Sequence, residues 1–356
     1  MTWRPLAAFA VGVVMLDASA AREVAIIIAR NTSGCHAEAP KLVGIHYEAW
    51  FPRQAWDNVW DLPLEGIYSS NDTTVVTRHA RQIAEAGVDF LRIDWTNNIV
   101  PMNPCDPGTP RVDLCEIEQA TTAMFDVFRA LAVRPNISIY LGISDASGVD
   151  LLSHIPDDLT AKANRVYDLY IQNPAYRAVY QYYLGKPLLP IFLGTPTACW
   201  TGGGFDARCS SGVPNWNDSR FTVRWVTGYV SSQPWLLDGL LSKYGYWSDL
   251  EREPLSYTML DGKTEQMAVD AYYPAPSPPV CPQGWAGRRS NGATFDREWN
   301  AVYARNPRIV VVNGFNTWVR AEQVDPDCSF DIEPSVVLGD RYIQLLKGYV
   351  SRYKAP

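Results

Sequence analysis

Short apolar runs rich in β-branched residues alternate with amphipathic helical stretches along most of the chain, and this alternation constrains the fold more than any other feature. The runs that read as strands are KLVGIHYEAW, VDFLRIDWTNN, ISIYLGISD, PLLPIFLGTP, RFTVRWVTGY, YGYWSDLE, TEQMAVDAYYP and RIVVVNGFN. Each is followed by a helical stretch or a long loop, which predicts a single-domain α/β fold, a closed (β/α)8 TIM barrel. An open, doubly wound sheet is the alternative that the pattern alone leaves open.

The helical stretches carry their own start and stop signals. TTVVTRHARQIAEAG is predicted to begin at Asp72 or Thr73 and to stop at Gly87. The region 157–185 is predicted to be helical with a break at Pro174, and GDRYIQLLKGYVSRYK forms the closing helix.

The first twenty residues have the pattern of a secretory signal, with Arg4, the apolar run LAAFAVGVVML and the small-residue end ASA. We therefore predict a signal peptide at 1–20, a lead-in at 21–42 and the barrel at 43–356. A membrane anchor is the alternative, but the run is short for a bilayer, and no later stretch is long and apolar enough to cross one. The expected location is extracellular, or periplasmic in a bacterium, with no membrane partner.

Secretion affects how the seven cysteines are interpreted, because cysteines tend to pair in an oxidising compartment. The expected pairs are Cys105–Cys115, Cys199–Cys209 and Cys281–Cys328, which leave Cys35 over. The chain contains no Cys-x-x-Cys motif and no Cys/His cluster, so a zinc site is not expected.

Charge and motifs exclude several other function classes. The formal net charge is -7 and there is no basic run, so a nucleic-acid partner is not expected. There is no Gly-x-Ser-x-Gly elbow, and the Gly-rich WTGGGFD lacks the Lys-Ser/Thr of a phosphate loop. We expect no cofactor and no metal.

Polar and aromatic side chains gather where the predicted strands end, which in a barrel is the active face. They are His46, Tyr47, Glu48, Trp50, Asp94, Trp95, Asn97, Asn98, Asp145, Tyr246, Trp247, Asp249, Tyr272, Tyr273, Asn316 and Trp318. Aromatic faces and carboxylate or amide edges suit sugar rings. Glycosidic bonds are usually cleaved by two carboxyl groups with separated pKa values, so we expect a polysaccharide or glycan substrate.

These segments resemble glycoside hydrolase family 99, the endo-α-mannosidase type, and more distantly the family 71 α-1,3-glucanases. The matching pieces are VGIHYEAWF, RHARQIAEAGVDFLRIDWTNN, NPAYRAVYQYYLGKPLLPIFLG, GRRSNGATFDREWNAVYARNPRIVVVNGFNTW and IEPSVVLGDRYIQLLKGYV, in the order of the family. The resemblance implies a (β/α)8 barrel that acts on a polysaccharide or glycan.

The chain departs from the family at its most telling motif. The family has FNEWHEG, whose two glutamates act as acid and base, whereas this chain has FNTWVRAEQ. Thr317 and Arg320 stand at the glutamate positions, and neither supplies a carboxylate. Glu322, two residues further on, is a candidate replacement.

Asp94, which matches the family's acid on strand two, is therefore the first choice for a catalytic carboxylate, followed by Glu48 and Glu322. The side chains expected to bind substrate are His46, Tyr47, Trp95, Asn97, Tyr246, Trp247, Asn316, Trp318 and Arg320. Glu333, in the IEPS match, is expected to fix the loop or the start of the last helix.

Two other functions fit the altered motif. One is a carbohydrate-binding barrel that has lost catalysis. The other is a polysaccharide lyase acting on an anionic glycan, with Tyr47 or His46 as base and Arg320 neutralising a uronate.

Overall fold

The computed structural model describes a defined part of the chain. The described residues are 40–51, 56, 59–96, 105–107, 112–142, 155–192, 200–201, 204–205, 216–227, 246–248, 255, 257–274, 287–318, 329 and 331–356. Lys41–Pro356 form one compact unit. The predicted signal peptide and nearly all of the predicted lead-in lie outside the described residues.

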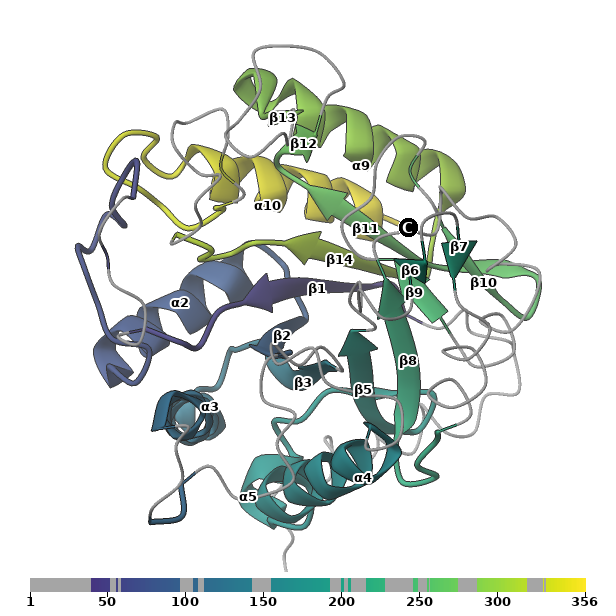
Figure 1. Ribbon diagram of the computed structural model, residues 1–356. Helices are drawn as coiled ribbons and strands as arrows, with labels where there is room; N and C mark the ends of the chain where they lie inside the picture. The colour runs from purple at the N-terminus through teal and green to yellow at the C-terminus, as the bar shows by residue number, and fades with distance from the viewer. Residues whose placement is uncertain are drawn as a thin grey trace, which may run out of the picture. The chain divides into compact units, whose positions relative to one another are not determined.

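A ten-stranded sheet forms the framework, and all eight predicted strands belong to it (Figure 1). The parallel strands are β1 (Leu42–Tyr47), β2 (Phe90–Trp95), β3 (Asn136–Gly142), β5 (Lys186–Phe192), β8 (Thr222–Thr227), β9 (Tyr246–Ser248), β11 (Lys263–Asp270) and β14 (Ile309–Asn313). Their hydrogen-bonded order is β11-β14-β1-β2-β3-β5-β8-β9, so the last strand in sequence lies beside the first. The sheet curls, and the fold is mixed α/β.

Short strands extend this framework. β10 (Thr258–Leu260) pairs antiparallel with β11, and β4 (Tyr182–Tyr183) pairs antiparallel with β5. Two separate hairpins are formed by β6 (Trp200–Thr201) with β7 (Gly204–Phe205), and by β12 (Tyr273–Pro274) with β13 (Gly287–Arg288).

Helices pack on the outer face of the sheet. They are α2 (Thr73–Glu85), α3 (Val112–Ala130), α4 (Ile155–Val166) with its π-helical extension (Tyr167–Ile171), α5 (Pro174–Arg177), α9 (Ala293–Arg305) after a 3-10 turn (Ser290–Gly292), and α10 (Arg341–Lys354). The start and stop predicted for α2 are confirmed. The Asp72 carboxylate accepts from the backbone N–H groups of Thr74 and Val75, and Gly87 follows the helix with φ 81°.

The two faces of the sheet have different environments because side chains alternate along a strand. On β1, Val43, Ile45 and Tyr47 belong to the main hydrophobic core, which also contains side chains of the outer helices. A second buried cluster on the opposite, inner face includes Phe90 and Tyr140. The strand positions that alternate with these outer-core residues therefore point their side chains toward the interior of the curled sheet.

The predicted break at Pro174 is confirmed, since α5 begins there with Asn173 as its cap. The prediction of helix up to residue 185 is wrong at its end, where β4 forms a hairpin with β5. Leu184 and Gly185 make the turn with φ of 50° and 80°. Both central residues of this two-residue turn thus adopt the positive φ that matches the twist of a hairpin.

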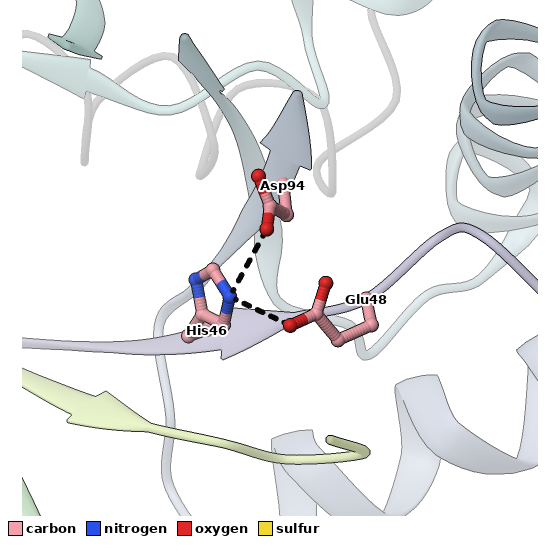
Figure 2. Close-up of side chains that lie close together, drawn as sticks. All are labelled: His46, Glu48 and Asp94. Atoms are coloured by element: carbon pink, nitrogen blue, oxygen red, sulfur yellow. Dashed lines mark hydrogen bonds and ion pairs between the residues drawn. The ribbon is translucent and has the colours of Figure 1, made fainter. Parts of the chain in front are cut away.

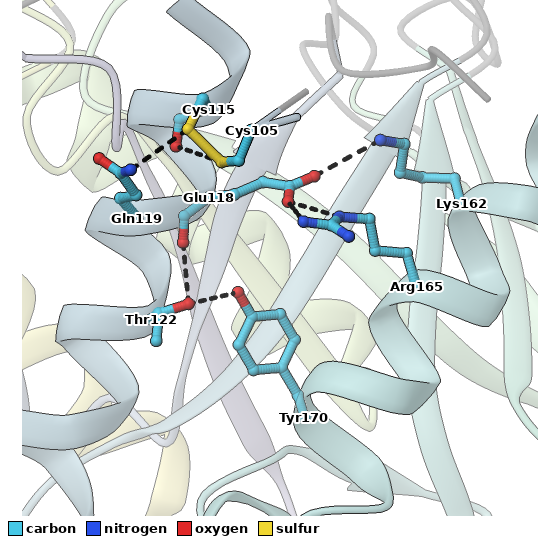
Figure 3. Close-up of a disulfide and its surroundings, with 8 residues drawn as sticks. All are labelled: Cys105, Cys115, Glu118, Gln119, Thr122, Lys162, Arg165 and Tyr170. Atoms are coloured by element: carbon cyan, nitrogen blue, oxygen red, sulfur yellow. Dashed lines mark hydrogen bonds and ion pairs between the residues drawn. A yellow bond between two sulfur atoms is a disulfide. The ribbon is translucent and has the colours of Figure 1, made fainter. Parts of the chain in front are cut away.

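The predicted Cys105–Cys115 disulfide is present at the amino end of α3 (Figure 3). The other predicted pairs and Cys35 lie outside the described residues, as do Asp145, Asp249 and the helix expected in QPWLLDGLLSK. In the part of the chain that the structure describes, no helix is long and apolar enough to cross a membrane.

Candidate functional site

Two neighbouring strands bring a histidine and two carboxylates together. β1 pairs with β2 in a register that sets His46 beside Arg92, so Glu48 and Asp94 reach the same edge of the sheet. Figure 2 shows His46 between the two acids. Its Nε2 lies 3.2 Å from Glu48 Oε1 and 3.6 Å from Asp94 Oδ2. One imidazole therefore serves two carboxylates.

Burial makes this arrangement electrostatically costly. Glu48 is completely buried, whereas Asp94 keeps 9% of its surface exposed. Burial and the nearby Glu48 charge raise the pKa of Asp94 to about 6, against the lowering effect of His46 and a hydrogen bond from the backbone N–H of Thr96. Asp94 thus holds its proton in mildly acidic water, as a general acid requires.

The backbone that presents Asp94 depends on a close approach by β3. A Cβ added at Gly142, the last residue of β3, would lie 2.3 Å from the carbonyl oxygen of Thr96. The Thr96 N–H donates to Asp94 Oδ1 over 2.6 Å. Glycine at position 142 therefore leaves room for the turn that holds the Asp94 carboxylate.

Asn316, in the loop after β14, holds the backbone of Glu48 from the other side. Its Oδ1 accepts from the Glu48 N–H over 2.8 Å, and its Nδ2 donates to the Glu48 carbonyl over 2.9 Å. Asn316 is fully buried. The loop after the last strand thus fixes a residue at the end of the first.

Another buried carboxylate, Glu333, anchors the surroundings of Asn316. Its Oε2 accepts from the Tyr68 hydroxyl over 2.9 Å and from Trp318 Nε1 over 2.7 Å, and its Oε1 lies 2.9 Å from His79 Nε2. The other ring nitrogen of His79 is bonded to the Tyr47 hydroxyl at 2.9 Å. Glu333 therefore joins the loop after β14 to α2 and to the loop after β1.

Tyr47 and Tyr68 remain neutral phenols at ordinary pH. Burial and the Glu333 charge raise the pKa of both well above the usual value. Tyr47 also points into the outer core, away from His46 and Asp94. Tyr47, one of the two bases named for the lyase alternative, is thus neither acidic nor turned toward the inner face.

Several inner-face residues were missed by sequence reasoning. Arg92 donates to Asn313 Oδ1 over 2.8 Å and lies 4.1 Å from the centre of the Tyr140 ring. Asp270 is the register partner of Asn313 and only 2% exposed. The predicted strand seven ran on past residue 270, whereas β11 ends there; a correctly placed strand end would have identified this acid.

The predicted aromatic contacts lie in packed positions. Trp95 belongs to the outer core and donates to Thr121, Trp247 lies in the inner cluster, and Trp318 bonds Glu333. All three are at most 1% exposed, so their contact with substrate stays a prediction. Thr317, at the family's first glutamate position, is buried. Asn97, Arg320, Glu322 and the side chain of Tyr246 lie outside the described residues.

His46, Glu48 and Asp94 are also the one group of potential metal ligands found among the described residues, with one ligand atom from each inside 4.8 Å. Two ligands of one zinc ion lie at most about 4.4 Å apart, and both distances from His46 Nε2 to the carboxylates are within this limit. In this structure the contacts of His46 with Glu48 and Asp94 hold the three side chains together.

Comparisons with known proteins point to one fold. No protein-family model matches the sequence, and no curated protein gives a significant match. Two solved structures of a family 99 endo-α-mannosidase from Bacteroides thetaiotaomicron are similar, with a TM-score of 0.55 and 16% identity over 87% of this chain and 97% of that one. A glycoside hydrolase-like protein has a TM-score of 0.50 and 12% identity over 87% and 94%. The fold is therefore of the family 99 type.

Proposed function

We propose that this protein is a glycoside hydrolase that cleaves a polysaccharide or glycan with the carboxylate pair Asp94 and Glu48. The observation that carries the proposal is the placement of both acids at the carboxyl ends of adjacent parallel strands, around one histidine. The family 99-type fold supports the class of reaction.

The two acids are assigned different roles because their environments differ. Asp94 is the partly exposed group whose pKa is raised to about 6, and it gives its proton to the oxygen of the leaving sugar. Glu48 is fully buried, and His46 donates to it when that imidazole nitrogen is protonated. Its negative charge stabilises the positive charge that develops at the anomeric carbon, an effect that grows in a buried site. A water molecule then forms the new bond to that carbon and returns a proton to the Asp94 carboxylate, which restores the acid.

We also propose that the curled sheet closes into a full (β/α)8 barrel. The parallel strands follow one another in sequence order around the sheet, and β14 pairs with β1. Residues of β9 and β11, the two ends of this path, are in contact. A closed barrel needs only the pairing of these two strands in addition to those described. Secretion is likewise part of the proposal, supported by the signal pattern and by the Cys105–Cys115 disulfide.

The test is digestion of a panel of plant, algal, fungal and bacterial polysaccharides, read by mass spectrometry and by proton NMR of the fresh anomers. Asp94→Asn and Glu48→Gln are expected to abolish nearly all turnover on the substrate found while leaving binding in place. Glu265→Gln is the matched control, since Glu265 is also a buried glutamate. It lies near the start of β11, away from the strand ends that carry the site, and it bonds Arg224 and Tyr183. Full activity in both site variants would overturn the proposal.

A carbohydrate-binding barrel without catalysis is the second candidate. The observation that favours it is the buried Thr317 at the position of the family's first catalytic glutamate. Binding to one polysaccharide with no product at any protein concentration would establish it. A lyase would instead release unsaturated uronates, which absorb in the ultraviolet.

A further inference from the structure

We propose that Asn316 is a positioning residue for Glu48, and that Tyr68 and Glu333 hold it in place. The loop after β14 would then brace a carboxylate that another strand carries. The inference rests on the proposed function, in which Glu48 belongs to the carboxylate pair.

The brace acts where the sheet itself no longer holds the chain. β1 ends at Tyr47, and the last backbone contact from the β14 side is the Phe315 N–H donating to the His46 carbonyl over 2.9 Å. The Asn316 side chain takes over at the next position that faces inward, bonding both the N–H and the carbonyl of Glu48. Two bonds on the two peptide groups that flank one Cα set the direction of its side chain.

The amide orientation of Asn316 is determined by a chain of donors and acceptors. Nδ2 also donates to the Tyr68 hydroxyl over 3.2 Å, and that hydroxyl in turn donates its hydrogen bond to Glu333 Oε2. A flipped amide would face the Glu48 N–H with a donor and the Glu48 carbonyl with an acceptor. The Glu333 carboxylate is bonded by Tyr68, Trp318 and His79. It therefore fixes the orientation of Asn316 indirectly, through the Tyr68 hydroxyl.

The position of Glu48 in turn affects Asp94. Among the described residues, Asp94 is faced by His46 of β1 and by Glu48, the residue after β1, and Tyr140 of β3 is its register partner. A Glu48 side chain released from its brace would move relative to this pair. The loop that lacks the family's glutamates at Thr317 and Arg320 would thus still control the reaction through geometry.

The experiment compares Asn316→Ala and Tyr68→Phe with the unchanged protein, using two readouts. The first is the carboxyl carbon signal of Asp94 in a pH titration by NMR, which needs no substrate. The second is the separate change in kcat and KM on the polysaccharide identified above. Tyr180→Phe is the matched control for Tyr68→Phe, because Tyr180 is an equally buried phenol that donates to the Leu188 carbonyl, away from the site.

We expect Asn316→Ala to lower kcat by about 10²-fold with little change in KM, since small misplacements of reacting groups cost this much. Asp94 should titrate at lower pH because the Glu48 charge is less well placed to oppose its ionisation. Tyr68→Phe should move both readouts in the same direction by less, and Tyr180→Phe should move neither.

An unchanged Asp94 titration and unchanged kcat in a folded Asn316→Ala variant would overturn the inference. If that variant does not fold, Tyr68→Phe decides by the same two readouts. Failure of the proposed function looks different, because then Asp94→Asn retains activity whatever the Asn316 variants do.

Discussion

Two buried clusters of this protein contain a glutamate and differ in how its charge is balanced. In the outer layer, Glu118 of α3 meets two cations, Lys162 at 3.5 Å and Arg165 (Figure 3). On the inner face, Glu48 and Asp94 meet one histidine (Figure 2). The outer cluster contains two cationic groups and one carboxylate, whereas the inner cluster contains two carboxyl groups and one imidazole. Surplus acid in a buried place is poor for stability and is what proton transfer needs.

The pKa values express the same contrast. Burial lowers the pKa of Lys162 to about 8, although Glu118 opposes this. Lys162 therefore loses its proton more easily than an exposed lysine, which reduces the surplus positive charge of the outer cluster. Burial and Glu48 raise the pKa of Asp94 to about 6, which leaves a proton available in the working range of many enzymes. The outer cluster therefore joins α3 to α4, whereas the inner cluster raises the pH at which Asp94, at the end of β2, releases its proton.

Turnover is the most direct test of whether the two clusters differ in function. Asp94→Asn should lower kcat by roughly 10²–10⁴-fold, the usual share of a general acid. Glu118→Gln should leave kcat unchanged per folded molecule, because Glu118 lies between helices outside the sheet. Initial rates at saturating substrate, corrected by active-fraction measurements, provide the check. Equal losses in both variants would mean that the two clusters are not functionally distinct.

Stability should respond in the opposite sense. Glu118→Gln removes the carboxylate that lies 3.5 Å from Lys162, which is 1% exposed, and breaking a buried ion pair costs about 3–5 kcal/mol. The low end is expected, since the side chain of Arg165 is 23% exposed and can turn to water. Urea unfolding at pH 7 measures the loss. A variant as stable as the parent would show that the outer cluster contributes nothing net.

Asp94→Asn should stabilise the protein above pH 6. The folded-state pKa of about 6 lies above the ordinary aspartate value of 3.8, so the ionised carboxylate costs the folded state roughly 3 kcal/mol at most. This cost is absent below the unfolded pKa and grows as pH rises through the folded one. Urea unfolding of both proteins at pH 4 and pH 8 should therefore agree at the lower pH and diverge at the higher, with the variant more stable.

Removing the disulfide should affect only the outer region. Cys105–Cys115 closes a short loop at the start of α3, whose loss costs about 2–3 kcal/mol through the entropy of the unfolded chain. Cys105→Ser/Cys115→Ser should unfold at lower urea concentration with kcat retained. A large drop in kcat would instead indicate that this loop also holds the inner site.

Much of the fold was predictable from local sequence. All eight parallel strands and the limits of α2 follow from periodicity and from signals such as Asp72 and Gly87. The hairpin of β4 was not predictable, because AYRAVYQYYLG has helical spacing and its turn uses Leu184 where Asn or Gly is the usual signal. Tertiary pairing with β5 overrides the helical pattern there.

The candidate site was predictable only in part. The rule that chemistry gathers at strand ends selects Asp94 and Glu48 from the sequence. That both lie against His46 depends on the register of β1 with β2, which the sequence does not specify. The partners of Glu333 are Tyr68, His79 and Trp318, and no local pattern connects a tyrosine at 68 to a glutamate at 333. Long-range hydrogen bonds of this kind leave no periodic trace.

The bond from Trp318 to Glu333 ties together the two ends of the segment that separates them, and this affects how such proteins can diversify. A loop whose ends are already held costs only about 0.6 kcal/mol for each doubling of its length. Insertions between these two residues can therefore accumulate without displacing the framework below. Natural variation, or a grafted peptide, between Trp318 and Glu333 is therefore expected to leave the scaffold unchanged.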